Sequence, residues 1–318
     1  MSFAIEPRGP FDLANQGRFF GGWLSEEQGA IVMAFPVEGW RTSAAVVLRQ
    51  GADGRVTGAV HPEGPDAERA WGQALAVVSL DVDGGGFPEI GRRDPVIGRL
   101  QERYGCLRPV LFHSPYEAAA NFVIGQRISM GQARQIRQRL AEALGVRVTV
   151  GSREVAAFPD PQTLLGLTDF PGVNAQKIDR LHGIARAALV GLLDRAALRR
   201  LPVDDALAAL RALPGVGPFS AQGILMRGAG LVDAVTEDDV TPQVMQLAYD
   251  LAERPNQAAV LGRAEAWRPY RMWCEVLLHV WLRREMGGPA RPEPTRARGP
   301  RRRATGTGTG RKRQVGGP

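Results

Sequence analysis

A short segment rich in glycine and proline, Leu213 to Ala221, has the composition of a backbone turn that could bind a phosphate group. Its two glycines, Gly215 and Gly217, lie two residues apart between two helical patterns. Glycine tolerates positive φ and lets an anion approach the backbone, and the first turn of the next helix presents unpaired N–H groups. The segment therefore predicts a turn that holds one phosphate without reading base sequence. An ordinary connection between helices has a similar composition, so the turn alone leaves both interpretations open.

A run of three acidic residues, Glu237, Asp238 and Asp239, follows about twenty residues downstream. A fixed carboxylate can stabilise a positive charge that develops in a transition state, and it can orient or deprotonate an attacking water. Aspartate is also a common N-cap residue, and Asp239 precedes a helical pattern that begins near Thr241. The spacing alone leaves catalysis and helix capping equally open for Asp239, and one residue can do both.

The elements that would position these residues fall into two groups. In the first third of the chain, short β-branched-rich runs alternate with turn signals, and the stretch from Gly51 to Gly54 is typical of a hairpin turn. The runs predict a small sheet with four strands, Ala30–Val37, Ser43–Leu48, Arg55–Val60 and Leu75–Val82.

The pattern becomes helical from Ser114 onward. Ser114 offers an N-cap, Pro115 suits the first helical position, and Glu117 stands where a capping-box acid would lie. We expect one long helix that ends at Gly145, with apolar positions Phe122, Ala133, Ile136, Leu140 and Leu144. From there to Met286 the pattern predicts helix after helix, with starts near Pro161, Ala175, Asp204, Ser220, Thr241, Gln257 and Tyr270.

The net charge of +7 is unevenly distributed along the 318 residues. Between Gly287 and Pro318, nine arginines and lysines face the single acid Glu293, so this tail carries +8 and the rest of the chain about −1. Its Pro, Gly, Thr and Arg composition predicts disorder. Such a tail suits loose binding to a polyanion, or it is simply solvated. We predict an N-terminal α/β domain over residues 1–107, a helical domain over 108–286 and a disordered basic tail over 287–318.

Several classes of protein are disfavoured by composition. No run of about 18 apolar residues and no secretory signal pattern is visible, so we expect a cytoplasmic protein with no membrane partner. The two cysteines, Cys106 and Cys274, cannot build a disulfide framework or a four-cysteine metal site, and we predict no catalytic metal. Only two lysines exist, Lys177 and Lys312, and we expect Lys177 to lie on the surface.

Several motifs in a shared order resemble the helix-hairpin-helix DNA glycosylase superfamily, and most closely its 3-methyladenine DNA glycosylase II branch. They are the glycine turn, the acidic run, and the segments Ile124–Ser129, Trp267–Arg271 and Leu277–Trp281. The resemblance covers about Arg93 to Met286. It implies a mainly α fold with two helical subdomains that form the catalytic domain, preceded by an N-terminal α/β sheet domain.

The resemblance also implies an activity. It is the hydrolysis of the N-glycosidic bond of alkylated bases, of 3-methyladenine or 7-methylguanine type, in damaged duplex DNA during base excision repair. Asp239 would be the catalytic carboxylate. The predicted DNA contacts are Gly215, Val216, Gly217, Ser220, Gln126 and Arg127. Arg127 would either fill the space left by a flipped nucleotide or simply contact phosphate.

The base pocket is the least determined part of the resemblance. Aromatic faces attract electron-poor, cationic bases, and the candidate walls are Phe219, Trp281 and one of Phe19 or Phe20, although each could instead be core. Two departures affect this prediction. Gly223 stands where a close relative carries tyrosine, and the interval from Pro269 to Trp281 is two residues longer than expected, so His279 competes with Trp281 for one position.

Family members that also cleave the strand use a lysine just after the hairpin glycines to form a Schiff base. This chain has Phe219 there, so we predict base excision without lyase activity. The alternatives are a glycosylase for deaminated or oxidised bases and a non-catalytic protein that binds damaged DNA. We expect a monomer without cofactors, apart from a structural monovalent cation that the resemblance implies at the hairpin.

Overall fold

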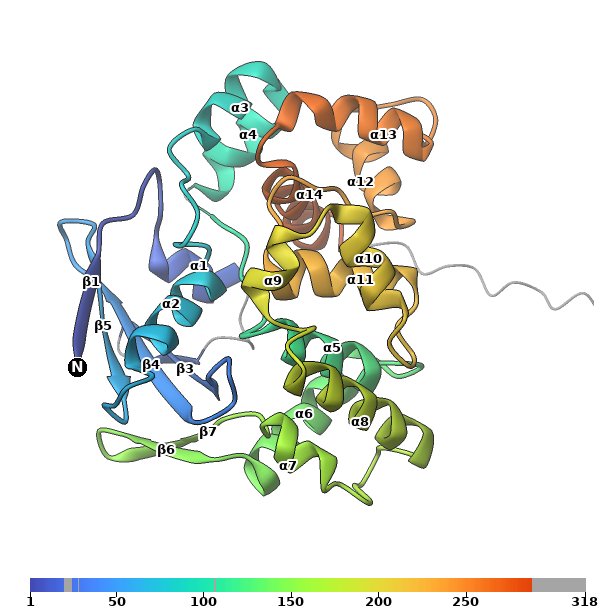
Figure 1. Ribbon diagram of the computed structural model, residues 1–318. Helices are drawn as coiled ribbons and strands as arrows, with labels where there is room; N and C mark the ends of the chain where they lie inside the picture. The colour runs from blue at the N-terminus through green and yellow to red at the C-terminus, as the bar shows by residue number, and fades with distance from the viewer. Residues whose placement is uncertain (20–24, 28, 106, 288–318) are drawn as a thin grey trace, which may run out of the picture.

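The computed structural model describes residues 1–19, 25–27, 29–105 and 107–287, without the side chains of residues 17–19 and 25–27. Helices predominate in this part of the chain, and the strands form one five-stranded sheet and one two-stranded hairpin (Figure 1). This confirms the predicted mainly helical fold with a small sheet near the N-terminus. None of the described helices is both long enough and apolar enough to cross a membrane.

The sheet is antiparallel throughout and has the order β1-β5-β4-β3-β2. Its strands are β1 (Ser2–Ile5), β2 (Ser25–Glu27), β3 (Ala30–Pro36), β4 (Ser43–Gln50) and β5 (Val56–His61). Three of the four predicted strands are therefore confirmed. The predicted turn between β4 and β5 is present, with a hydrogen bond of 2.9 Å from Gly51 N–H to the carbonyl of Arg55. Helix α1 (Leu13–Phe19) follows β1.

The predicted strand Leu75–Val82 is wrong. Its first residues are the last turn of helix α2 (Ala67–Val77), which packs against β4 and β5. Ala67, Ala70, Ala74 and Val77 recur at helical spacing and are buried against the sheet. The apolar run at the end of this helix has the length and composition of a buried strand, and periodicity alone cannot separate the two cases.

The single long helix predicted from Ser114 to Gly145 is also wrong. It is two helices, α5 (Pro115–Ile124) and α6 (Met130–Leu144), joined by the loop 125–129. Ser129 caps α6 and forms a complete capping box with Gln132, so a second helix start lies inside the helical pattern. In the loop, Arg127 has a φ of 58°, a left-handed conformation that no helix contains.

The remaining helices confirm most predicted starts to within a few residues. They are α3 (Phe87–Arg93), α4 (Pro95–Tyr104), α7 (Pro161–Leu165), α8 (Ala175–Leu189), α9 (Arg195–Arg200), α10 (Val203–Arg211), α11 (Pro218–Gly223), α12 (Val240–Ala248), α13 (Gln257–Ala264) and α14 (Arg271–Glu285). A π-helical turn, η1 (Ile224–Ala229), continues α11, and a 3-10 turn, η2 (Glu265–Trp267), precedes α14. Like α1 and α2, the helices α3, α4 and α9 have no counterpart among the predicted helices.

Two apolar cores hold these elements together. The first joins the sheet and α2 to α3, α4 and the last three helices, α12 to α14. The second lies among α5 to α11 and η1. The two groups occupy different regions of Figure 1. Helices from both sides of the predicted boundary between residues 107 and 108 share the first core, because α4 packs on α14. The division into domains at that boundary stays a prediction.

One segment interrupts the helical region. Strands β6 (Arg147–Val150) and β7 (Arg153–Ala156) form an antiparallel hairpin where the sequence pattern predicted only helices. Val150 and Val155 pack against Ala30, Val32 and Val47. Because neighbouring residues of β3 point to opposite faces, the hairpin covers the face of the sheet that the main core leaves open. Figure 1 shows it extending from the helices beneath the sheet.

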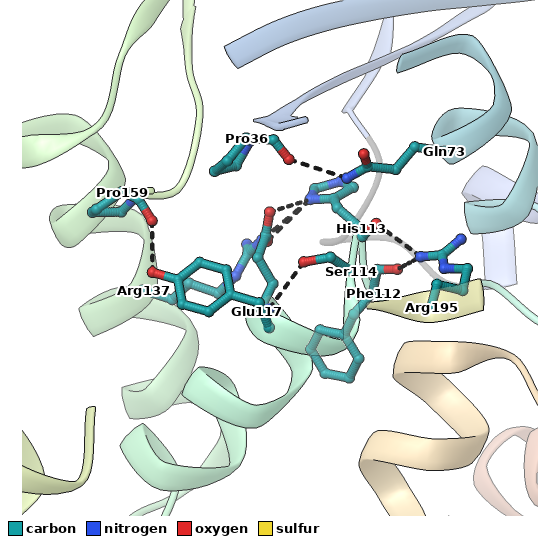
Figure 2. Close-up of polar contacts among 10 residues, drawn as sticks. Pro36, Gln73, Phe112, His113, Ser114, Glu117, Arg137, Pro159 and Arg195 are labelled. Atoms are coloured by element: carbon teal, nitrogen blue, oxygen red, sulfur yellow. Dashed lines mark hydrogen bonds and ion pairs between the residues drawn. The ribbon is translucent and has the colours of Figure 1, made fainter. Parts of the chain in front are cut away.

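A network of polar contacts joins the sheet region to the helices. Gln73 on α2 donates to the carbonyl of Pro36 at the end of β3, over 3.1 Å. Arg195 on α9 donates to the carbonyls of Phe112 and His113, over 3.2 and 2.8 Å. Figure 2 shows both pairs flanking the start of α5. Arg195 thus fixes residues 112 and 113 to α9, and its Nε also lies 3.8 Å from the carboxylate of Glu38, just after β3.

At the centre of Figure 2 lies a buried group of three charged or ionisable side chains. Glu117 is fully buried, its carboxylate lies 3.1 Å from Nδ1 of His113, and it accepts a hydrogen bond from Arg137 of α6. The prediction for Glu117 was half right. Ser114 does cap α5, accepting from Glu117 N–H over 3.1 Å, but the Glu117 carboxylate turns to its charged partners and does not complete a capping box.

Candidate active site

The glycine turn lies where the sequence predicted it, between α10 and α11. Val216 N–H donates to the carbonyl of Leu213 over 3.0 Å, and the buried Val216 side chain anchors the turn in the second core. Gly215 has a φ of 80°, and a Cβ atom there would lie 2.4 Å from Cδ of Arg180. Gly217 is exposed at the start of α11, with open space where its Cβ would be. The hairpin thus presents its backbone to solvent at the N-terminal end of α11.

Gly215→Ala is expected to lower the free energy of unfolding by about 1–2 kcal/mol, since alanine must adopt a left-handed conformation and also displace Arg180. Gly217→Ala is the matched control, because its Cβ meets nothing within 4 Å. Urea denaturation of both variants measures the difference. Equal stability of the two variants would contradict this account of the turn.

The loop between α5 and α6 is attached to the hairpin. Gln126 Nε2 donates to the carbonyl of Gly215 over 2.6 Å, and the Gln126 side-chain oxygen accepts a hydrogen bond from Arg180 of α8. Arg127 is exposed beside it. These residues line one groove, of about 950 Å³, together with Lys177 and the turn 169–174. The structure therefore brings the predicted contacts Gln126, Arg127 and Gly215 onto one surface.

The prediction that Lys177 lies on the surface is wrong. The side chain is buried, with 8% of the residue exposed, and its Nζ donates to the carbonyl of Ile124 over 2.7 Å. Burial and the neighbouring charge of Arg180 lower the pKa of Lys177. Its amine satisfies the C-terminal end of α5, where helix carbonyls lack partners, so it holds the loop 125–129 in place from below.

The acidic run forms the segment that leads into α12. Asp238, and not Asp239, caps this helix, because its Oδ1 accepts hydrogen bonds from the backbone N–H of Val240 at 2.9 Å and of Thr241 at 2.7 Å. Asp239 is exposed, and within the described residues its carboxylate has no hydrogen bond or ion pair. The capping interpretation thus applies to the neighbour, and the Asp239 carboxylate remains available to a ligand.

The acidic segment lies against the hairpin helix. The side-chain oxygen of Gln222, a buried residue on α11, accepts a hydrogen bond from Glu237 N–H over 2.9 Å. Asp239 is two residues further along the chain. The hairpin turn and the acidic run, separated by about twenty residues in the sequence, are therefore joined through one helix. Sequence reasoning missed Gln222, and an isolated amide in an apolar helix gave no specific signal.

A polar cluster from α14 supports the same segment. Glu275, with 3% exposure, accepts from Thr236 N–H at 3.1 Å and from Thr241 Oγ1 at 2.6 Å, and His279 Nε2 lies 3.2 Å from Thr241 Oγ1. Among the described residues, Asp238, Glu275 and His279 form the group that could hold a metal ion, since one ligand atom from each lies within 4.8 Å of the others. Each of these side chains already has a protein partner.

The predicted aromatic wall is partly present. Phe219 is 59% exposed at the start of α11, and its ring meets that of Phe122 edge-on, with centroids 5.9 Å apart. A Cβ atom at Gly223 would lie 2.1 Å from the Phe122 ring. Phe122, which the pattern predicted only as a core position of α5, therefore occupies the space that a side chain at position 223 would need. An aromatic ring reaches this surface from a different helix than expected.

The other aromatic candidates are Trp281 and the pair Phe19 and Phe20. Trp281 is half-buried and packs on the first core, whereas His279 contacts Thr241 in the acidic segment. Of the two residues that competed for one position, His279 is the one bonded beside Asp239. Phe20 lies outside the described residues, as does the side chain of Phe19.

The chain is similar to known proteins both in sequence and in fold. No protein-family model matches the chain. In sequence it is 25% identical over 204 residues to the DNA-3-methyladenine glycosylase of Bacillus subtilis (strain 168), covering 63% of this chain and 67% of that protein. It is 28% identical over 192 residues to DNA-3-methyladenine glycosylase 2 of Escherichia coli (strain K12), covering 56% and 62%. The matches thus span about two thirds of the length of these curated relatives.

The fold is shared with solved structures over nearly the whole described chain. A 3-methyladenine DNA-glycosylase from Archaeoglobus fulgidus superimposes with a TM-score of 0.72 at 18% identity, covering 88% of this chain and 97% of that one. An 8-oxoguanine glycosylase/lyase from Clostridium acetobutylicum, in complex with duplex DNA, superimposes with a TM-score of 0.65 at 16% identity and the same coverage. These likenesses establish the fold.

Proposed function

We propose that this chain belongs to the 3-methyladenine DNA glycosylase II branch of the helix-hairpin-helix superfamily, and that it hydrolyses the N-glycosidic bond of alkylated bases in duplex DNA. The observation that carries the proposal is the exposed Asp239 carboxylate, relieved of capping by Asp238 and held beside the hairpin helix. The test is incubation of the purified protein with methylated DNA, followed by chromatography of the released bases. Free 3-methyladenine or 7-methylguanine is expected, and their absence would overturn the proposal.

The chemistry follows from the charge on Asp239. As the bond between base and sugar breaks, positive charge develops on the sugar ring, and a nearby carboxylate stabilises this transition state more than the ground state. The same carboxylate can orient or deprotonate the water that attacks the sugar. An alkylated base that already carries a positive charge leaves without being protonated, so this substrate class does not require a general acid.

The target bond is buried in duplex DNA, so the nucleotide must be extruded. The hairpin would hold a phosphate through backbone N–H groups near Gly217 and Ser220. Arg127 would fill the vacated space, because it projects from a loop tied to the hairpin through Gln126. A monovalent cation at the hairpin would be held by turn carbonyls. Those of Leu213 and Gly215 already accept one hydrogen bond each, and each retains a second lone pair.

Arg127→Ala is expected to lower the rate of base release from a fully paired duplex about tenfold. The rate should fall much less on a duplex in which an abasic site lies opposite the lesion, because no base pair has to be opened there. The comparison of single-turnover rates on the two duplexes measures the effect. An equal loss on both would indicate that Arg127 only contacts phosphate, since each lost phosphate contact weakens binding to any duplex alike.

We also infer that the protein does not cleave the strand. Phe219 follows the hairpin where strand-cleaving relatives carry lysine, and the amine of Lys177 is occupied by the carbonyl of Ile124. Borohydride is therefore expected to trap no covalent complex between protein and abasic DNA. A glycosylase with lyase activity on the same DNA serves as the positive control, and a trapped complex with this chain would contradict the inference.

A second candidate function is supported by the altered aromatic surface. Phe122 stands in the space beside Gly223, and a solved structure of the same fold is an 8-oxoguanine glycosylase/lyase. This arrangement is compatible with deaminated or oxidised bases as substrates. Duplexes that each contain one hypoxanthine or one 8-oxoguanine distinguish the two functions, because only the second candidate predicts faster release from them than from methylated DNA.

A further inference from the structure

The segment Thr236 to Thr241 carries the proposed catalytic carboxylate, and its side-chain contacts define how firmly that carboxylate is held. Asp239 itself has no partner among the described residues, so its position depends on the backbone on either side. A misplacement of about 1 Å can cost on the order of 10²-fold in rate. Some other group must therefore fix this segment.

We propose that Glu275 is a positioning residue for Asp239, because its buried carboxylate bonds to both ends of the segment Thr236–Thr241. At the first residue it accepts from Thr236 N–H, with 3.2 Å to Oε1 and 3.1 Å to Oε2. At the last residue it accepts from Thr241 Oγ1 over 2.6 Å. The inference rests on the proposed function for its catalytic meaning, but the clamp itself is a property of the fold.

Burying a carboxylate at position 275 costs free energy, which indicates that its hydrogen bonds have a function. Glu275 is the single carboxylate between Met272 and Leu282, a stretch of α14 that is mostly buried and largely apolar. Burial raises the pKa of Glu275, and the nearby His279 and the hydrogen bond from Thr241 act against that rise. A leucine would suit the surrounding core better. What the carboxylate adds is two acceptor atoms directed at one loop.

The neighbouring contacts complete the clamp. His279 lies one helical turn beyond Glu275 and contacts the same Thr241 hydroxyl over 3.2 Å. Asp238 is fixed independently by the N–H groups of Val240 and Thr241. The residues on both sides of Asp239 are thus held by α14 and by the start of α12. The backbone of Asp239 is therefore fixed, while its carboxylate makes no hydrogen bond within the described residues.

Two quantities test the proposal in each variant: the single-turnover rate of base release, and the rate of hydrogen–deuterium exchange over residues 233–245. Glu275→Leu removes both acceptors, so it is expected to lower the rate on the order of 10²-fold and to speed exchange in the segment. Glu275→Gln keeps one carbonyl acceptor and is expected to recover most of the rate. Thr241→Ser keeps the hydroxyl and the rate, whereas Thr241→Val removes the hydroxyl and lowers the rate about tenfold.

Two controls separate positioning from stability and from DNA binding. Glu117→Gln alters another buried carboxylate, away from the site, and is expected to lose stability but keep its rate and its exchange over residues 233–245. Affinity for a duplex with an abasic-site analogue should be unchanged in every variant. Unchanged exchange in Glu275→Leu, or a wild-type rate in that variant, would overturn the proposal. Faster exchange in a protein whose wild type releases no base would uphold the clamp and reject only the proposed function.

Discussion

Replacing Asp239 with asparagine is expected to lower the rate of base release about a thousand-fold. A carboxylate about 4 Å from the positive sugar ring contributes roughly 4 kcal/mol at an effective dielectric near 20, and each 1.4 kcal/mol corresponds to about tenfold in rate. Asparagine keeps the size of the side chain and can still bind a water, but it carries no charge. Single-turnover release of 7-methylguanine measures the loss, and binding to a duplex with an abasic-site analogue should remain.

The adjacent acid supplies a matched control. Asp238 caps α12 through its Oδ1, and asparagine is as good an N-cap as aspartate. Asp238→Asn should therefore keep both the fold and most of the activity. If Asp238→Asn lost activity while Asp239→Asn kept it, the two carboxylates would have the opposite roles. If both variants kept full activity, neither carboxylate would be catalytic, and a binding protein without chemistry would be the better description.

The hairpin turn could be predicted from sequence because local chemistry determines it. A turn with φ near 80° at Gly215 strongly favours glycine, and the start of the helix after it can be predicted from neighbouring residues alone. Helix starts at Asp160, Asn174 and Asn256 likewise have side-chain caps visible in the sequence. For Asp239 two roles were open, and the structure assigns the capping to Asp238.

The features that were missed depend on contacts between distant segments. The end of α2 has the apolar composition of a strand, and its packing on the sheet determines that it is helical. Strands β6 and β7 form where the sheet has an apolar face at Val32 and Val47 that they cover. A lysine is usually exposed, so the sequence favoured a surface position for Lys177. Its partner, the carbonyl of Ile124, belongs to a helix more than 50 residues earlier in the chain.

The support around the site was also missed, although one signal was present. Glu275 is a carboxylate inside a long apolar pattern, and a charged residue at such a position is seldom buried without a partner. Its partners, Thr236 and Thr241, lie more than 30 residues away, so the sequence could mark Glu275 as unusual but could not show what it holds. Gln126 is a similar case, because its bond to Gly215 spans 89 residues.

Removal of the Glu117 carboxylate is expected to have the largest effect on stability. Burial alone would raise its pKa, but His113 and Arg137 outweigh burial and lower the pKa from 4.5 to about 2. A lowered pKa in the folded state stabilises the fold at every pH above about 4.5, and that contribution is lost as the pH falls toward about 2. The shift corresponds to about 3 kcal/mol at neutral pH. Glu117→Gln should therefore unfold at a clearly lower urea concentration at pH 7.

The pH dependence distinguishes this charge network from ordinary packing. The difference in unfolding free energy between wild type and Glu117→Gln should be constant from pH 7 to about pH 5 and should shrink steadily below pH 4.5, because the wild-type carboxyl becomes neutral like the glutamine. Glu142→Gln, an exposed position on α6, should differ from wild type by less than about 0.5 kcal/mol throughout. A difference for Glu117→Gln that did not change with pH would mean that shape, and not charge, makes Glu117 necessary. Because His113 lies just before α5 and Arg137 lies on α6, and both contact this carboxylate, we expect its charge to link the start of α5 to α6.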